Sequence, residues 1–497
     1  MKKLIKAIVI TMLLVTSLSV QIYAEDAKYL YGNAKSEKEM YENLVSHSGH
    51  EILTEYMELE NKGASVLIPY ACALVDKYDE FESQEIVSLL LQEETLSEVE
   101  SVLVELLNSK GEDFNKYLEL QEAETVEMNT KQLLLLNKSV SINEWKKYVN
   151  LGKDFRTRSA MQMISFTDER LALDMAIDLL KNKPTYYQIS AINIAVNQYY
   201  RDHPEDETHK EEIITMLLDL YNKTEDEQEH FWIMDSLGCL QDYTLFLEVL
   251  DNDNIQNWDK YVFLFSSSKL IDRLEENDCK ENLDYREKYS CLMSEEELYN
   301  NLKEMLNTSS VAWRGYAVYR DGVLGSLNHH AALMHYNSIT GGSSYSSYPN
   351  ANDVIQASGP SYTVDKESWS TFLDGHSFVA ACKPVTCSMS NSDIVHFIYK
   401  GTTLIGTAYV FVRQITYNQL YDNSIVEPSR ITALRCDGVI EYVYEYYGYK
   451  VGGSSNNWNI SIDNSSNYAA HNLYNITPKI QNESLLTRVT TQQSDLY

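Results

Sequence analysis

Two side chains in the C-terminal half, Cys436 and His330, could together cleave an amide bond. A cysteine attacks a carbonyl carbon as the thiolate, and a histidine within reach takes the thiol proton and later protonates the leaving amine. An apolar pattern with helical spacing follows Cys436 and ends at Gly448, so we expect the cysteine at the start of a helix. There the helix dipole favours the thiolate, and Arg435 adds positive charge. The same position also suits a small buried residue with no chemical role.

The histidine stands at the head of an apolar strand, in the run His329-His330-Ala331-Ala332-Leu333-Met334. Side chains alternate between the two faces of a strand, so His329 and His330 point in opposite directions and only one of them can face a given site. The same geometry keeps the pair from chelating one metal ion easily, and no other histidine has metal-ligand spacing. We therefore predict no metal and no cofactor.

These segments resemble the NlpC-type cell-wall cysteine peptidases of the papain-like superfamily. The resemblance is carried by the run Arg435-Cys436-Asp437-Gly438-Val439, by His330 before small and aliphatic residues, by Gln356 after an apolar pair, and by Tyr409 in a Gly-x-x-Tyr element. His330 precedes Cys436, which is the order of the circularly permuted branch of that family. Gln356 stands where many members have His, and Asp437 stands where Ser is usual.

The resemblance implies an α+β papain-like domain over residues 308–480, with Cys436, His330 and Gln356 as catalytic residues. Gln356 would orient His330, while backbone N–H groups beside Asp437, together with Tyr409, would bind the oxyanion or substrate. The implied substrate is a peptide or isopeptide bond, with cell-wall peptidoglycan as the leading choice. Two alternatives remain open: acyl transfer or thioester hydrolysis by the same dyad, and a degenerate module attached to a helical scaffold that binds a protein partner.

Residues 25–307 read as a succession of helices, with an apolar stripe at helical spacing in one of them (Ala172, Met175, Ala176, Leu179, Leu180). Helix pairs recur roughly every 30–40 residues, which resembles HEAT-like repeats, although an irregular bundle fits the pattern too. Near Thr308 the composition changes, and short strands are predicted at 317–319, 331–334, 353–355, 394–399 and 408–412. The chain is thus predicted to be multidomain, ending in a polar tail at 481–497.

The start of the chain predicts export. A basic start, an apolar run and Ala24 form a secretory signal peptide over residues 1–24, which we prefer to a membrane anchor because the run is short. We therefore expect a secreted or cell-wall-associated protein with no integral membrane segment after cleavage. The net charge of −32 argues against a nucleic-acid partner. Seven cysteines leave at least one thiol that is free or pairs between molecules, and bridges between Cys382 and Cys387 or between Cys279 and Cys291 stay open.

Overall fold

The computed structural model describes most of the 497-residue chain. The described residues are 29–59, 63–77, 97–110, 118, 128–252, 254–267, 313–322, 329–335, 354–358, 363–411, 413–418, 426–451 and 476–496. The predicted signal peptide, the predicted boundary near Thr308 and the cysteines Cys279 and Cys291 lie outside these residues. Within the described ranges, no helix has the length and apolar character needed to cross a membrane.

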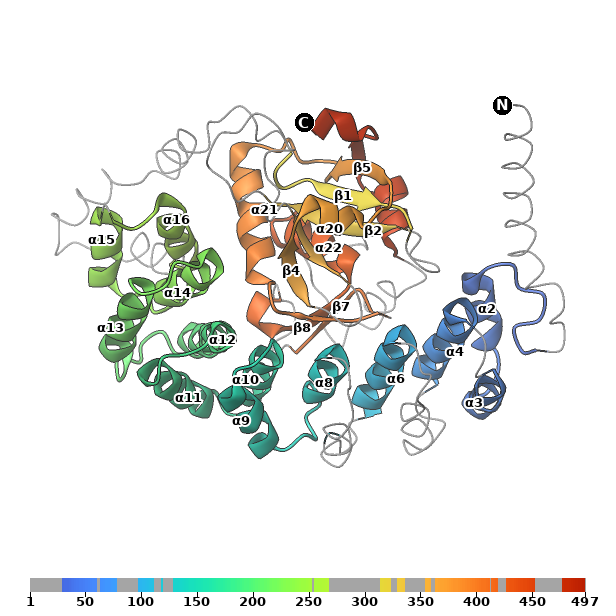
Figure 1. Ribbon diagram of the computed structural model, residues 1–497, viewed down its shortest axis with the longest axis horizontal. Coiled ribbons are helices and arrows are strands. Elements are labelled where there is room, and N and C mark those ends of the chain that lie inside the picture. Colours follow the sequence, from blue (N-terminus) through green and yellow to red (C-terminus); the bar gives the residue numbers. More distant parts are fainter. Residues whose placement is uncertain are drawn as a thin grey trace.

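The described part of the N-terminal half is helical and forms an arc (Figure 1). Successive helices of an inner row pack against one another, and the helices between them lie on the outer side. The inner row is α4 (Ala64–Asp76), α6 (Ser97–Lys110), α8 (Met128–Leu135), α10 (Arg156–Thr167), α12 (Tyr186–Asp202), α14 (Glu227–Cys239) and α16 (Asn257–Ser266). The remaining helices are α2 (Glu37–Leu44), α3 (Gly49–Glu58), α9 (Ile142–Leu151), α11 (Glu169–Lys181), α13 (Lys210–Tyr221) and α15 (Tyr243–Asp251).

Local signals in the sequence start and stop these helices. Asp168 caps the first turn of α11, and Thr185 forms a capping box with Gln188 at the start of α12. Gly152 ends α9 in the left-handed conformation. The predicted stripe on α11 is confirmed, with Ala172, Ala176, Leu179 and Leu180 buried and Met175 partly buried against the core.

The C-terminal half contains a six-stranded antiparallel sheet in the order β4-β3-β2-β1-β5-β9 and a small sheet in the order β6-β8-β7. The bounds of the large sheet are β1 (Ala317–Arg320), β2 (His330–Met334), β3 (Val354–Ala357), β4 (Val364–Glu367), β5 (Phe378–Lys383) and β9 (Thr487–Thr490). The small sheet consists of β6 (Ala408–Tyr409), β7 (Ile415–Tyr417) and β8 (Ile431–Leu434). A multidomain α plus α+β layout was predicted, and at this level the prediction is confirmed.

Helices cover both faces of the large sheet. On one face, Ala331, Leu333 and Ile355 belong to the same core as α21 (Asn391–Thr403) and α22 (Cys436–Tyr446). On the other face, Ala332 and Met334 pack with α20 (Trp369–Leu373). Alternation along β2 therefore assigns each of its side chains to one of two separate cores.

Two predicted strands are wrong in whole or in part, and the polar tail has more structure than its pattern indicated. Residues 394–399 lie in α21 and not in a strand, because Ser390 and Asp393 form a capping box and the β-branched run becomes the buried side of a helix. The strand predicted at 408–412 is only the two residues of β6. The polar tail is folded, since β9 pairs with β5 after a helical stretch formed by α24 (Pro478–Ile480) and η5 (Gln481–Leu485).

The concave side of the arc holds the α+β domain (Figure 1). Buried polar side chains of the inner row donate to main-chain oxygens of that domain: Gln132 Nε2 to Gly406 at 3.3 Å, and Gln162 Nε2 to Ser429 at 2.6 Å and to Ile431 at 2.8 Å. A buried carbonyl without a donor is costly, so these bonds join the two halves specifically.

Candidate active site

Cys436 is the first residue of α22, as the sequence predicted, and one residue separates it from the end of β8. Its side chain is 1 % exposed. The backbone N–H groups of Ala331 and Asp437 lie close enough to the sulfur to favour its thiolate form. Ala331 pairs with Tyr319 of β1, but on its other side the pairing of β2 with β3 covers only Leu333 and Met334. The N–H of Ala331 is therefore not used by β3 and is available to the sulfur. The sulfur therefore lies against the residue that follows His330.

The thiol of Cys436 is held neutral. Burial, and then the negative charge of Asp437, raise its pKa to about 12, against the opposing effects of the Ala331 N–H and of Arg435. The helix start and Arg435 favour the thiolate as predicted, but the net shift is towards the neutral thiol. Its physical reason is that desolvation of the charged form outweighs both favourable contributions.

Arg435 and Asp437 form a fully buried ion pair beside the cysteine. Arg435 Nε lies 2.7 Å from Asp437 Oδ1, Nη2 lies 2.9 Å from Oδ2, and both side chains are 0 % exposed. Gln414 Nε2 donates to the same carboxylate at 3.2 Å. The Asp437 carboxylate thus holds Arg435, and the group that Asp437 presents to the sulfur is its backbone N–H.

Tyr409, the other predicted oxyanion or substrate-binding residue, lies in β6 and is buried. It pairs in register with Leu434, two residues before the cysteine, and its electrostatic influence reaches Arg435. Tyr409 therefore belongs to the strand layer that supports the start of α22.

His330 and Gln356 are brought together. His330 Nε2 and Gln356 Oε1 are 2.7 Å apart, and both side chains are buried. Burial, and then the charge of Arg320, lower the pKa of His330 to about 3, although the Gln356 bond acts in the opposite direction. The ring packs 5.8 Å from that of Phe372 on the α20 side of the sheet. Cys436 belongs to the core on the opposite face, and among the described residues no hydrogen bond joins it to His330, so the structure does not bring the two together.

His329 points to the other face of β2, which is the face that packs against α22 and Cys436. Asn482 Nδ2 donates to its Nδ1 at 2.9 Å, and burial lowers its pKa. The neighbouring Gln481 accepts from Tyr319 at 2.7 Å and donates to the main-chain oxygen of Asp437 at 3.1 Å. These supporting residues were missed from the sequence, because the residues that follow Gln481 carry only a polar pattern and no local signal of a site.

The cysteines carry no cross-link in the described part of the chain, where Cys382 and Cys387 are both free. In the same ranges, no group of His, Cys, Asp and Glu side chains could hold a metal ion. The groups that the site offers are a thiol, an imidazole bonded to an amide, and backbone N–H donors.

Comparisons with known proteins add no assignment. No family model matches the chain, and neither the curated proteins nor the solved structures give a match.

Proposed function

We propose that the chain is a secreted cysteine hydrolase of the circularly permuted NlpC type, with Cys436 as nucleophile and His330 as base. The observation that carries the proposal is the meeting of Cys436, at the start of α22, with the backbone N–H that follows His330. The 2.7 Å bond from His330 to Gln356 adds support, because it leaves Nδ1 of the ring for the thiol proton.

In this mechanism the free enzyme holds a neutral thiol and a neutral imidazole. Substrate binding brings the scissile carbonyl to the sulfur. His330 must leave Phe372 on the α20 face and reach the sulfur past the end of β2, so that its Nδ1 takes the thiol proton as the C–S bond forms. Catalytic hydrogen bonds that are long or unformed without substrate commonly tighten in the complex. The imidazolium then protonates the leaving amine, and water hydrolyses the acyl-enzyme. Backbone N–H groups at the start of α22 would stabilise the oxyanion, with Tyr409 supporting their position.

The proposed substrate is a peptide or isopeptide bond of cell-wall peptidoglycan, on the strength of the family resemblance and the predicted export signal. The helical half is proposed to be a HEAT-like scaffold whose concave side is taken by its own hydrolase domain, which leaves the convex side for a protein partner.

The adjacent histidines give a matched control for the test. Cleavage of muropeptides should be lost in Cys436→Ala and fall about 10²–10⁴-fold in His330→Ala, while His329→Ala keeps most of it. Full cleavage by Cys436→Ala refutes the nucleophile assignment. Loss in His329→Ala but not in His330→Ala transfers the role of base to His329. Cleavage of short-chain thioesters but not muropeptides would favour the acyl-transfer alternative.

A degenerate hydrolase module on a binding scaffold is the second candidate, and the raised pKa of the Cys436 thiol favours it. The two candidates differ in what substrate does to the thiol. An active enzyme should form a covalent adduct at Cys436 with a peptide that carries an electrophile, even at pH 7, because binding triggers proton transfer. A scaffold should form none until the pH approaches the pKa of the thiol.

A further inference from the structure

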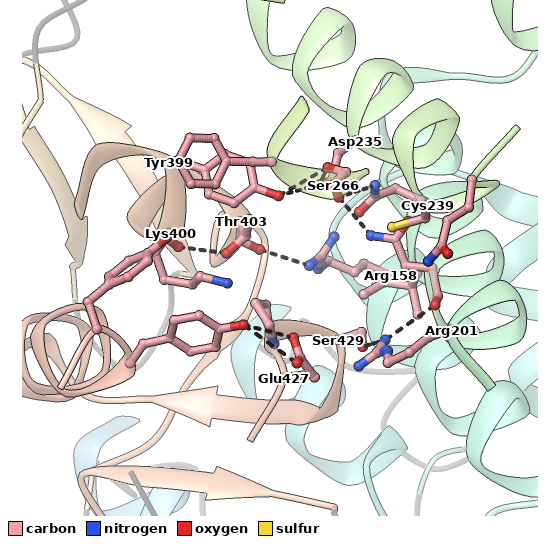
Figure 2. Close-up of a pocket in the computed structure, with 18 residues that line it drawn as sticks. Arg158, Arg201, Asp235, Cys239, Ser266, Tyr399, Lys400, Thr403, Glu427 and Ser429 are labelled. Atoms are coloured by element: carbon pink, nitrogen blue, oxygen red, sulfur yellow. Dashed lines mark hydrogen bonds between the residues drawn. The ribbon is translucent and has the colours of Figure 1, made fainter. Parts of the chain in front are cut away.

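A cavity of about 310 Å³ lies where the helical arc meets the α+β domain (Figure 2). Its walls come from α10, α12, α14 and α16 on one side, and from α21, the segment before β8 and the end of α22 on the other. This volume is at the lower end of the range typical of small-molecule sites. Because α22 has 11 residues, its cavity end lies roughly 15 Å from the Cys436 end, so the cavity is separate from the candidate active site.

Lys400 reaches into this cavity, and its side chain forms no ion pair within the described ranges, although the charge of Glu427 favours its ammonium form. The residue is only 5 % exposed, and Figure 2 shows its ammonium group directed between Arg158 and Glu427. The Nζ atom lies 3.4 Å from the centre of the Tyr446 ring, and it makes no hydrogen bond or ion pair with any residue in the described ranges. A buried ammonium with only a ring face beside it has unused donors.

Of the other charged groups in the cavity, Asp235 already has its hydrogen-bond partners, whereas Arg201 has N–H groups that are not used. Asp235 accepts from Tyr399 at 2.8 Å and from Asn193 and Asn197 at 2.9 and 2.7 Å, so neutral donors saturate its carboxylate. Arg201 uses Nη2 on the hydroxyl of Ser429 at 2.6 Å and on a main-chain oxygen at 3.3 Å, which leaves its other guanidinium N–H groups.

The balance of charge is positive. Three cations line the cavity (Arg158, Arg201, Lys400) against two carboxylates (Asp235, Glu427), in a protein whose net charge is −32. Burial lowers the pKa of Lys400 to about 8, so the ammonium remains mostly charged at pH 7 but is costly there without an anion. The charged and titratable groups that face Lys400 are Arg158 from α10, Arg201 from α12, Asp235 and Cys239 from α14, Glu427 before β8, and Tyr446 from α22.

We propose that this cavity binds a small organic or inorganic anion, carrying a carboxylate or phosphate group, between the ammonium of Lys400 and the guanidinium of Arg201. The ligand would touch both halves of the chain, since Arg201 belongs to the arc and Lys400 to the α+β domain. The aromatic walls of the cavity, including Tyr446, suit a ligand with a small apolar part behind its anionic group. The site would therefore stabilise the docked arrangement of the two halves by mass action.

Calorimetric titration of the full chain with sodium phosphate and, separately, sodium succinate tests the proposal. One of these anions should bind at a single site at pH 7, and which one binds identifies the anionic group. Lys400→Met should weaken that binding at least tenfold. Lys210→Met is the matched control: Lys210 is equally buried, but Pro204 and Glu207 already bond its ammonium outside the cavity, so this variant should bind like wild type.

Absence of binding by both anions overturns the proposal, as does equal affinity in Lys400→Met and wild type. Arg201→Gln provides an independent arm if Lys400→Met does not fold, and it should also lose affinity. Cys436→Ala should bind as wild type does, so the outcome does not depend on whether the hydrolase assignment is right.

Discussion

Asp437→Asn should strongly destabilise the α+β domain, because it leaves the guanidinium of Arg435 buried without a counter-charge. Both partners are 0 % exposed and joined by two bonds of 2.7 and 2.9 Å. Removing one partner of such a buried pair costs about 3–5 kcal/mol. For a domain of this size, about 2–4 °C per kcal/mol gives a fall in Tm of roughly 6–20 °C. Thermal unfolding followed by circular dichroism measures it.

A partly exposed pair supplies the control. Asp154→Asn removes the counter-charge of Arg156, whose side chain is 20 % exposed, and should cost less than about 1 kcal/mol because water replaces the partner. The double variant Arg435→Met with Asp437→Leu should recover most of the lost stability, since no charge then remains buried. Equal losses in Asp437→Asn and Asp154→Asn would refute this reasoning about burial.

The same variant has a second, chemical readout. Asp437 raises the pKa of the Cys436 thiol, so Asp437→Asn should move the pH profile of iodoacetamide alkylation at Cys436 towards lower pH. An unchanged profile would mean that burial alone controls the thiol.

Three further predictions concern packing and pH. Gly438→Ala should lower the Tm by several degrees, because the new Cβ would lie 2.1 Å from the main-chain oxygen of Gln414, whereas Gly63→Ala meets nothing within 4 Å and should leave the Tm unchanged. Because the pKa of His330 is lowered to about 3, the unfolded chain binds more protons than the folded chain between pH 6.5 and 3. The free energy of unfolding should therefore fall as the pH is lowered through this range. Urea titrations of His330→Gln should show a shallower fall. Because the pKa of Lys400 is lowered to about 8, the unfolded chain binds the extra proton above that pH; stability should rise from pH 8 to 9.5, and Lys400→Met should lack this rise.

The parts of the molecule that sequence reasoning located are those fixed by local pattern. The helix that begins at Cys436 and the strands at 317–320, 330–334 and 354–357 each carry their own periodicity and end signals. The contact between His330 and Gln356 followed from the family resemblance, which places both residues at one end of neighbouring strands.

Contacts between distant segments could not be predicted. The tail returns to the site through Gln481, which bonds the main chain of Asp437 from 44 residues further along the sequence. The protonation state of Cys436 also escaped prediction, because it depends on complete burial and on how Arg435 and Asp437 neutralise each other. The sequence shows which charged residues neighbour a cysteine, but it does not show how far the thiol is buried, and burial decides the pKa of the thiol.

The hydrogen bonds from Gln132 and Gln162 to main-chain oxygens of the α+β domain limit which truncated fragments of the chain can fold stably. A fragment that starts near Trp313 would expose these acceptors and the apolar surface around them, and the isolated helices would in turn expose both amides and their apolar surroundings to water. Tandem helical arrays usually tolerate the gain or loss of a unit, but removing α8 or α10 here would shift the amides out of register with their carbonyls. The length of this array is therefore fixed by the domain that it encloses.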